Sequence, residues 1–412
     1  FKRKGYTFDV GASMIFGFGE KGYTNLLTRA LRDINEICET IPDPVQLEYH
    51  LPSNFSISVD KSYEKFIGKL SERFPNEKEG IKRFYGTCSN VFNCLDSMPL
   101  LSIEDPSYLF KVFLKAPLSC LGLARWLPIN AGDVARKLIK DPELLRFIDI
   151  ECFCWSVMPA LKTPMINAGM VFTDRHAGGI NYPKGGVGKI AEKLVSGIER
   201  LGSKIRYKAN VIEILLKDKK AIGVKLSNGD EIYSDIVVSN STRWDTFGLN
   251  NHKKGLIKND QVPKSENRWS ETYKPSPSFV SIHLGVSKDL INKDFNCHHI
   301  IVENWEELEN EKGVIFISIP TLLDSSLAPE GKHIIHAFTP SSIDGWENLS
   351  RDDYLKKKQD YFSFLIEKIS KIIPNLDQNI DHKEIGTPRT HRKFLGRFEG
   401  SYGPIPNKKL LG

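Results

Sequence analysis

The chain has 412 residues, 40% of them hydrophobic, which is enough to bury a large core and predicts about two or three structural units. The formal charge of +6 is mild and no basic block with interleaved aromatic residues appears, so nucleic acid is not an expected partner. Seven cysteines without a CxxC pair predict neither a disulfide framework nor a zinc site, and they favour a reducing compartment.

The N-terminal stretch predicts a strand that leads into a glycine turn. Residues 6–10 are strand-like, and Gly11, Ala12 and Ser13 follow at once. A glycine after a strand marks backbone that passes close to another group, or that takes a conformation other residues resist. Because position 1 is Phe rather than Met, we interpret this stretch as the middle of a motif whose first half is missing.

The most apolar region, residues 108–132, is not expected to span a membrane, because basic residues interrupt it and prolines break it. Two alternatives stay open for residues 108–127. The segment lies at a membrane surface, with apolar side chains in the lipid and basic side chains at the headgroups, or it forms a buried helical lid. The side chains expected at such a surface are apolar Phe110, Phe113, Leu114 and Trp126 and basic Lys111, Lys115 and Arg125.

The middle of the chain predicts the order glycine turn, helix, strand, hairpin, strand. A glycine turn at 183–186 precedes apolar residues at helical spacing, and Gly202 supplies a C-terminal stop. The first strand is apolar enough to be covered on both faces. Asn228-Gly229 is a strong hairpin signal, and the returning strand ends at Ser239-Asn240. The predicted bounds are 190–201 for the helix, 211–216 for the first strand and 232–238 for the returning strand.

Four apolar or alternating runs in the C-terminal half predict a mostly antiparallel sheet, and a long helix is expected to pack on it through Leu355 and later apolar residues. One run is expected at the edge of the sheet. It contains His298 and His299, which have no third ligand at useful spacing, so no metal site is expected there. A polar loop at 250–270 is predicted to join two domains. The runs are 279–286, 298–303, 314–320 and 333–339, and the helix is 352–374.

The glycine motifs resemble those of a known superfamily. The 183–186 turn, its helix and the segments "KANVIEI" and "GDEIYSDIVVSN" resemble the second FAD-contacting segment of the flavin amine oxidase and phytoene desaturase superfamily. "GYTFDVGASMI" resembles the turn that approaches the flavin ring. The likeness extends over essentially the whole chain. The motifs similar to the carotenoid cis-trans isomerase branch are "FDVGASMIFGFG", "DRHAGGINYPKGGVGKIAEKL", "VVSNSTRWDTFG" and "GSYGPIPNKKLLG".

This resemblance implies an α/β fold, namely an FAD-binding dinucleotide fold that is incomplete here, with an α+β substrate domain built on an antiparallel sheet and a helical lid. The G-x-G-x-x-G fingerprint of the family is not found in the sequence, so the chain is expected to be a fragment lacking both termini. The implied domain order is FAD-binding domain 1–25, substrate domain with lid 26–175, FAD-binding domain 176–247 and substrate domain 248–412.

The resemblance also implies an activity, which is FAD-dependent cis-to-trans isomerisation of a poly-cis carotenoid to an all-trans-lycopene type of product. Reduced flavin would serve without net redox change. An FAD-dependent carotenoid desaturase or retinoid saturase is an alternative, and a non-enzymatic lipid-binding escort protein of the same fold is another. Because the implied substrate dissolves in lipid, peripheral association with a membrane is expected, in a bacterial cytoplasm, at a thylakoid face or in a plastid.

An uncharged polyene must be bound through buried apolar area, so an apolar tunnel is expected. The stretches 147–161 and 164–172 are rich in aromatic residues, Met and Cys, which suits the walls of a tunnel. The alternative is that they only form core helices, and both can hold together.

The resemblance implies FAD contacts, while the catalytic residues stay unknown. Asp174, Arg175 and His176 precede a glycine turn, where they would flank the flavin or the polyene, and a solvated loop or structural salt bridge is the alternative. Val211 is expected to offer its main chain to the adenine edge. No metal is expected, and the sequence leaves the oligomeric state open. The residues expected to bind FAD are Gly11, Ala12, Ser13, Gly185, Gly186, Val211 and Asn240.

Overall fold

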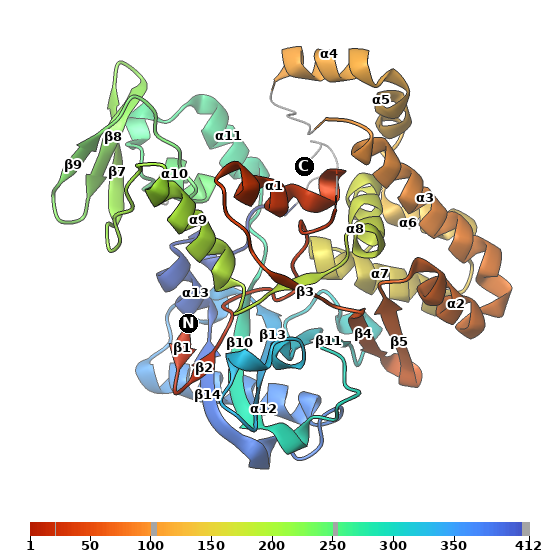
Figure 1. Cartoon of the computed structure of the whole chain (residues 1–412). Helices are drawn as coiled ribbons and strands as arrows, with labels where there is room; N and C mark the ends of the chain where they lie inside the picture. The colour runs from red at the N-terminus through yellow and green to blue at the C-terminus, as the bar shows by residue number, and fades with distance from the viewer. Residues whose placement is uncertain (21, 100–104, 250–253, 406–412) are drawn as a thin grey trace.

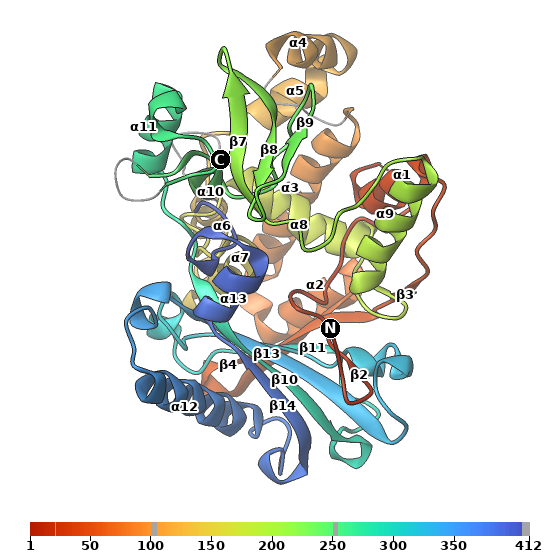
Figure 2. The same cartoon turned by 90° about the vertical axis from the view of Figure 1, so that its left-hand side faces the viewer.

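The computed structural model describes residues 1–20, 22–99, 105–249 and 254–405. A large sheet with the long helix α12 (Arg351–Ile369) beneath it forms the base, a group of helices stands on one side, and a small three-stranded sheet stands on the other (Figure 1). The helices α4 (Pro106–Lys115) and α5 (Pro117–Ala124) lie at the end of the molecule opposite α12 in both views (Figure 2).

The large sheet is antiparallel except for one pair, which confirms the interpretation of the C-terminal runs. The exception is the parallel pair of β11 and β4, which joins the two halves of the chain. The expectation that the run at 298–303 lies at an edge is wrong, because β11 has a hydrogen-bonded neighbour on each side. In sheet order the strands are β14 (Ile380–Gly386), β10 (Ser278–Ser287), β13 (Lys332–Ser341), β12 (Ile315–Ser318), β11 (His298–Ile301), β4 (Val45–Leu51) and β5 (Phe55–Asp60).

One face of this sheet packs on α12. Every second side chain of a strand points to this same face. Ile282 and Leu284 of β10 are buried in one cluster with Leu365 and Ile369 of α12. Burying a side chain of this size contributes about 1.5–3 kcal/mol. Leu355 was expected in the same contact, but it lies in the first turns of α12 and is 44% exposed, so that part of the prediction is wrong.

The helices beside the sheet pack around α3. Its apolar residues recur every three or four positions, so one stripe of the helix is buried. α3 and α8 approach closely at Gly169, where an added Cβ would lie 2.7 Å from the side chain of Val91. The helices are α2 (Tyr63–Arg73), α3 (Lys78–Asp96), α6 (Ala131–Leu138), α7 (Pro142–Ser156) and α8 (Met165–Ala177).

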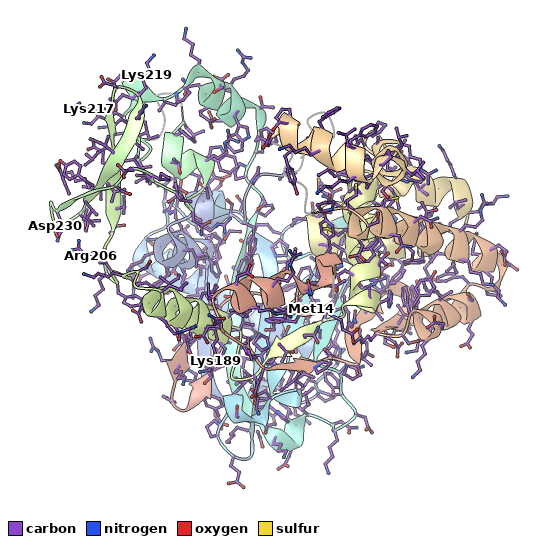
Figure 3. The ribbon with its side chains drawn as sticks, turned by 45° about the horizontal axis from the view of Figure 1, so that its top comes forward. Met14, Lys189, Arg206, Lys217, Lys219 and Asp230 are labelled. Atoms are coloured by element: carbon purple, nitrogen blue, oxygen red, sulfur yellow. The ribbon has the colours of Figure 1, made fainter. Side chains whose placement is uncertain are left out.

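The small sheet consists of β7 (Val211–Lys217), β8 (Lys220–Leu226) and β9 (Glu231–Tyr233). The predicted hairpin turn is confirmed, with Gly229 at φ 95° between β8 and β9. Two expectations are wrong. Only Ile214 of β7 is buried, so the strand is not covered on both faces, and the returning strand ends at Tyr233. Figure 3 shows Lys217 and Lys219 together at one end of this sheet and Arg206 near Asp230 at the other.

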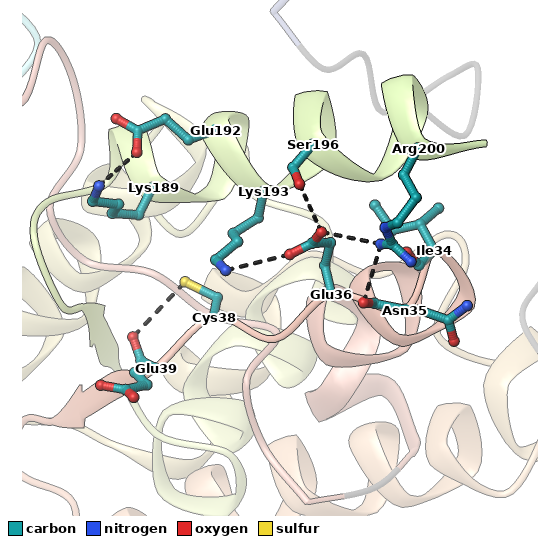
Figure 4. A network of polar contacts seen from close by, with 10 residues as sticks. All are labelled: Ile34, Asn35, Glu36, Cys38, Glu39, Lys189, Glu192, Lys193, Ser196 and Arg200. Carbon is teal, nitrogen blue, oxygen red and sulfur yellow. Dashed lines mark hydrogen bonds and ion pairs between the residues drawn. The ribbon is translucent and has the colours of Figure 1, made fainter. Parts of the chain in front are cut away.

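The predicted helix at 190–201 is confirmed as α9 (Gly188–Arg200). It is tied to the segment that follows α1 (Leu26–Asp33) through the carboxylate of Glu36 (Figure 4). Glu36 accepts a hydrogen bond from Ser196 at 2.8 Å and forms ion pairs with Lys193 at 3.3 Å and Arg200 at 3.0 Å. These contacts hold the segment that follows α1 against α9.

The predicted loop at 250–270 is partly helical. α11 (Lys264–Thr272) occupies its end, and α10 (Arg243–Phe247) precedes it, while residues 250–253 lie outside the described part of the chain. Pro263 stands directly before α11. The proline was interpreted as part of a loop, but a proline also occurs commonly at the start of a helix. The remaining elements are β1 (Lys2–Arg3), β2 (Tyr6–Thr7), β3 (Thr40–Pro42), β6 (Asn181–Pro183) and α13 (Pro388–Leu395).

Within the described residues, no single helix is both long and apolar enough to cross a bilayer. α4 and α5 meet that requirement only when they are counted together, and they are bent by 115° relative to each other. All seven cysteines are unpaired thiols.

Candidate functional site

Two glycine turns that lie far apart in the sequence meet at the carboxylate of Asp9. Its Oδ1 accepts the backbone N–H of Val187 at 2.9 Å. Its Oδ2 accepts the hydroxyls of Tyr182 at 2.7 Å and Ser13 at 3.1 Å. Asp9 therefore fixes the first turn, at residues 9–13, against the second turn.

The carboxylate of Asp9 is 5% exposed, and burial raises its pKa while these three hydrogen bonds oppose that shift. A buried carboxyl group with three donors is costly to remove, because each donor would lose its acceptor. The interaction thus fixes both turns in one arrangement.

The second turn depends on glycine at two positions. Gly185 and Gly186 have φ angles of 89° and 100°, which side chains rarely tolerate. The N–H of Gly185 donates to Asp324 at 2.6 Å, and an added Cβ at Gly186 would lie 3.3 Å from the Oδ1 of Asp9. The close approach of the two turns explains why the second glycine is needed.

The first turn leaves one side open. Gly11 and Ala12 are exposed, and a Cβ added at Gly11 would meet no protein atom within 4 Å. Ser13 is buried, and Met14 behind it lies near the centre of the molecule (Figure 3). Rigid turns with backbone open to one side can receive a flat aromatic ring system, so the residues present fit a flavin.

The structure brings five of the expected FAD residues together and places two elsewhere. Gly11, Ala12 and Ser13 belong to the first turn, and Gly185 and Gly186 to the second. Val211 begins β7 and pairs with Leu226 of β8. Asn240 lines a separate hollow beside Trp244 and Tyr402.

A hollow of about 360 Å³ lies between α7, α8 and residues 402–405. Trp155, Met170, Val171, Phe172 and Tyr402 contribute to its wall, and its described lining contains no Asp, Glu, Lys, Arg or His. The four other hollows that we describe each contain at least one charged side chain. Both sequence stretches interpreted as tunnel walls contribute to this hollow, and both also form core helices.

Arg175 is enclosed in a buried ion pair. Its guanidinium lies 2.5 Å from the carboxylate of Glu151, and the two side chains are 2% and 0% exposed. The hydroxyl of Tyr85 donates to the same carboxylate, and the rings of Phe66 and Phe172 flank the guanidinium at 4.8 and 5.0 Å. This arrangement fits the structural alternative that the sequence left open for Arg175.

Asp174 and His176 are the sequence neighbours of Arg175. The Nδ1 atom of His176 is 3.1 Å from the carbonyl of Lys61, and burial together with the charge of Arg175 lowers the pKa of His176 to about 3. Burial raises the pKa of Asp174 to about 6, although the N–H of Gly178 partly opposes this. Neither side chain lines the uncharged hollow.

Replacing Asp174 by Asn should change how stability depends on pH. The pKa of Asp174 in the folded state, about 6, exceeds the ordinary aspartate value of about 3.9, so the unfolded state ionises first. The folded state therefore loses stability as pH rises from about 4 to about 6. A shift of this size corresponds to at most about 3 kcal/mol. We expect D174N to gain stability relative to the parent between pH 4 and 7, as measured by urea unfolding. A constant difference across this range would contradict the assignment.

Comparison with known proteins defines the class. The profile of the family described as flavin containing amine oxidoreductase matches residues 137–378. The solved structure of an oxidoreductase from Methanosarcina mazei has the same fold, with a TM-score of 0.59 and 16% identity, over 93% of this chain and 78% of that one. The architecture is thus the α/β fold of this class of oxidoreductases.

Two plant proteins extend the match to the whole chain. A chloroplastic prolycopene isomerase of Daucus carota is 52% identical over 100% of this chain and 67% of its own length. That of Arabidopsis thaliana is 51% identical over 100% of this chain and 69% of its own length. The chain belongs to the flavin-containing amine oxidoreductase family, in the branch of the prolycopene isomerases. The cofactor of this family is a flavin.

Sequence reasoning missed the side chains that hold the site. Asp9 stood in a quoted motif without a role, and Tyr182 and Asp324 were not singled out. Asp9 and Tyr182 are 173 positions apart, and Gly185 and Asp324 are 139 positions apart, so no local pattern reveals these pairs.

Proposed function

We propose that this protein catalyses cis-to-trans isomerisation of a poly-cis carotenoid, of the kind that converts prolycopene into all-trans-lycopene, with reduced FAD and no net redox change. The observation that carries the proposal is the identity of 52% to a protein named prolycopene isomerase, over the whole of this chain. The organisation into FAD-binding and substrate regions along the chain is part of the same proposal.

The uncharged hollow supports this substrate class. A polyene offers no charge and no hydrogen-bonding group, so its affinity must come from apolar area at about 25 cal/mol per Å². A hollow of about 360 Å³ can enclose a section of such a molecule. The thioether of Met170 and the rings of Trp155 and Phe172 can follow a bent chain without demanding a polar partner.

The chemistry requires a transient loss of double-bond order, because rotation about a conjugated double bond removes π overlap. When bound, a reduced flavin would supply electron density for this and would recover it afterwards. The residues of this chain position and isolate the reaction. Asp9 locks the two turns together, and the uncharged wall of the hollow keeps charged side chains away from the polyene.

Product analysis tests the function. The flavin of the loaded protein is first reduced, the protein is incubated with a poly-cis carotenoid, and the products are separated and their masses are measured by mass spectrometry. We expect an all-trans product of unchanged mass without an added electron acceptor. A product lighter by two hydrogens would establish a desaturase instead, and a purified protein without flavin absorbance would favour the escort alternative.

Replacing Val171 by Glu should abolish isomerisation while leaving the flavin bound. The change puts a charge into the uncharged wall, and burying that charge against a polyene costs well above the 1.4 kcal/mol that corresponds to a tenfold loss. We expect the rate to fall at least tenfold. Thr87→Glu serves as the matched control, because it adds the same charge to a different hollow. Equal activity of the two variants would show that the polyene does not bind in this hollow.

The outer surface of α4 and α5 supports docking to an anionic lipid membrane. Phe110 and Leu114 are each 63% exposed, and Leu118 is 83% exposed, whereas Val112 and Leu123 are buried against the core. Residues 106–127 contain Lys111, Lys115 and Arg125 and no acidic residue. Exposed apolar side chains among basic ones match a lipid surface with anionic headgroups. Trp126 is partly buried against the core, so it contributes less than the sequence suggested.

Vesicle flotation tests this surface. Replacing Phe110 and Phe113 by Asp should release the protein from phosphatidylserine-containing liposomes, because two acidic side chains replace two exposed aromatic rings. The double variant should keep its unfolding midpoint. Phe394→Asp is the matched control, since Phe394 is 77% exposed on α13 and should not affect flotation. Unfolding of the double variant, or unchanged flotation, would place the membrane contact elsewhere.

A further inference from the structure

Three potential metal ligands face the α12 side of the large sheet. Glu48 and His50 are two positions apart on β4, so their side chains point to the same face. The parallel register of β4 and β11 sets His299 opposite Glu48. His299 and His50 are 249 positions apart, which explains why the sequence showed no third ligand near His299.

We propose that Glu48, His50 and His299 bind one divalent transition-metal ion of the zinc class. The Nε2 of His50 lies 3.1 Å from the Nδ1 of His299, and that Nδ1 lies 3.8 Å from the Oε2 of Glu48. Neighbouring ligand atoms around tetrahedral Zn²⁺ are about 3.3 Å apart, given bonds of about 2.0–2.1 Å. The distances in the protein bracket that value, so only small side-chain movements are needed.

Asn296 orients two of the three ligands. The backbone carbonyl oxygen of Asn296 lies 2.8 Å from the Nε2 of His299 and accepts its proton. The Nδ1 of His299 then has its lone pair facing the other two ligands. The side-chain amide of Asn296 donates to the Oε2 of Glu48 at 2.6 Å. Histidine ligands typically use their second ring nitrogen in this way, and carboxylate ligands are typically held by a donor.

The two rings also contact each other directly, with the Nε2 of His50 3.1 Å from the Nδ1 of His299. A hydrogen bond between the two rings can close the cluster without an ion, and zinc titration separates that arrangement from metal binding.

An ion has a path to the cluster. The side chain of Glu48 is 28% exposed, and it lines an open hollow of about 410 Å³ that also contains Lys69 and Arg73. These two cations are already paired, Lys69 with Asp60 at 2.5 Å and Arg73 with Glu143 at 2.5 Å. The open side leaves a fourth coordination position for water.

The site is independent of the proposed isomerisation. Asp9 and its turns lie on the other face of the sheet, where Tyr6 stands over Gly285. On this face, Ile301 of β11 is buried with α12. The ion would therefore join β4 to β11, the parallel pair that connects the two halves of the chain.

Zinc titration tests the proposal. The full, flavin-loaded chain is stripped with a chelator, dialysed and titrated with Zn²⁺ alone by calorimetry, and zinc X-ray absorption then reports the donor atoms. We expect one ion per chain, a shell of nitrogen and oxygen only, and at least about tenfold weaker binding for E48Q and for H50Q. N296A, which removes the amide that holds Glu48, should also weaken zinc binding. E72Q, in the same hollow, should bind normally.

Three outcomes would overturn the proposal. One is the absence of saturable binding, and another is unchanged affinity in both E48Q and H50Q. The third is sulfur in the zinc shell, which would move the ion to the separate buried group of Asp43, Cys297 and His298. The thermal unfolding midpoint of each metal-free variant identifies any variant that fails to fold, and H50Q and E48Q change partly exposed residues, which limits that risk.

Discussion

Replacing Arg175 by Met should lower the free energy of unfolding by about 3–5 kcal/mol, the usual cost of breaking a buried pair. The substitution leaves the carboxylate of Glu151 at 0% exposure without its cation, next to the hydroxyl of Tyr85. It also removes the guanidinium from between the rings of Phe66 and Phe172. Urea unfolding monitored by circular dichroism measures the loss.

A matched control is the exposed pair of Arg146 and Glu306, which lie 2.7 Å apart with side chains 44% and 74% exposed. Arg146→Met should cost less than about 1 kcal/mol, since exposed pairs contribute little. The double variant R175M/E151L should recover much of the loss, because no uncompensated charge remains. Equal losses for Arg175→Met and Arg146→Met would show that the buried pair is not what stabilises this part of the fold.

Replacing Gly11 by Val should abolish flavin retention while leaving the protein stable. A side chain at this position meets no protein atom within 4 Å, and the backbone has no positive φ, so the fold itself has no reason to reject Val. The added atoms would occupy the open side of the first turn, where we expect the flavin ring. The ratio of flavin absorbance to protein absorbance measures retention after gel filtration.

Gly68→Val is the control for this experiment, because Gly68 also has free space around it but lies on α2, far from the glycine turns in the sequence. That variant should keep its flavin. Gly186→Val is a poor choice, since its φ of 100° would strain the backbone and mix folding with binding. Normal flavin content in the Gly11 variant, at unchanged stability, would show that the ring lies elsewhere.

The sequence predicted the periodic elements well, because periodicity records burial. The antiparallel sheet, α9 and α12 follow from alternation and helical spacing, and the hairpin at Gly229 follows from turn chemistry. The wrong expectations concern how strands pair with the strands beside them. A run of apolar residues does not reveal whether a strand lies at an edge, as for β11, and it does not reveal where pairing stops, as for β9.

The same division applies to the candidate sites. The second glycine turn could be predicted because Gly185 and Gly186 adopt positive φ angles, which glycine tolerates better than other residues do. The side chains that hold them could not, since Asp9 reaches Tyr182 and Val187 only through the tertiary fold. Roles for Val211 and Asn240, which the structure places away from the turns, stay predictions.

The parallel pair of β4 and β11 also has a consequence for how the chain acquires its structure during synthesis. The strands that it joins are about 250 residues apart, so at about 5–20 residues per second a ribosome needs roughly 12–50 s to supply β11 after β4 has emerged. Until then β4 presents an unpaired edge that could recruit other chains. The helices that follow directly, α2 and α3, bury Phe66 and Phe84 in the same cluster as Leu47 and Tyr49 of β4. Early packing of these helices would shield one face of the β4–β5 hairpin while it waits for its partner.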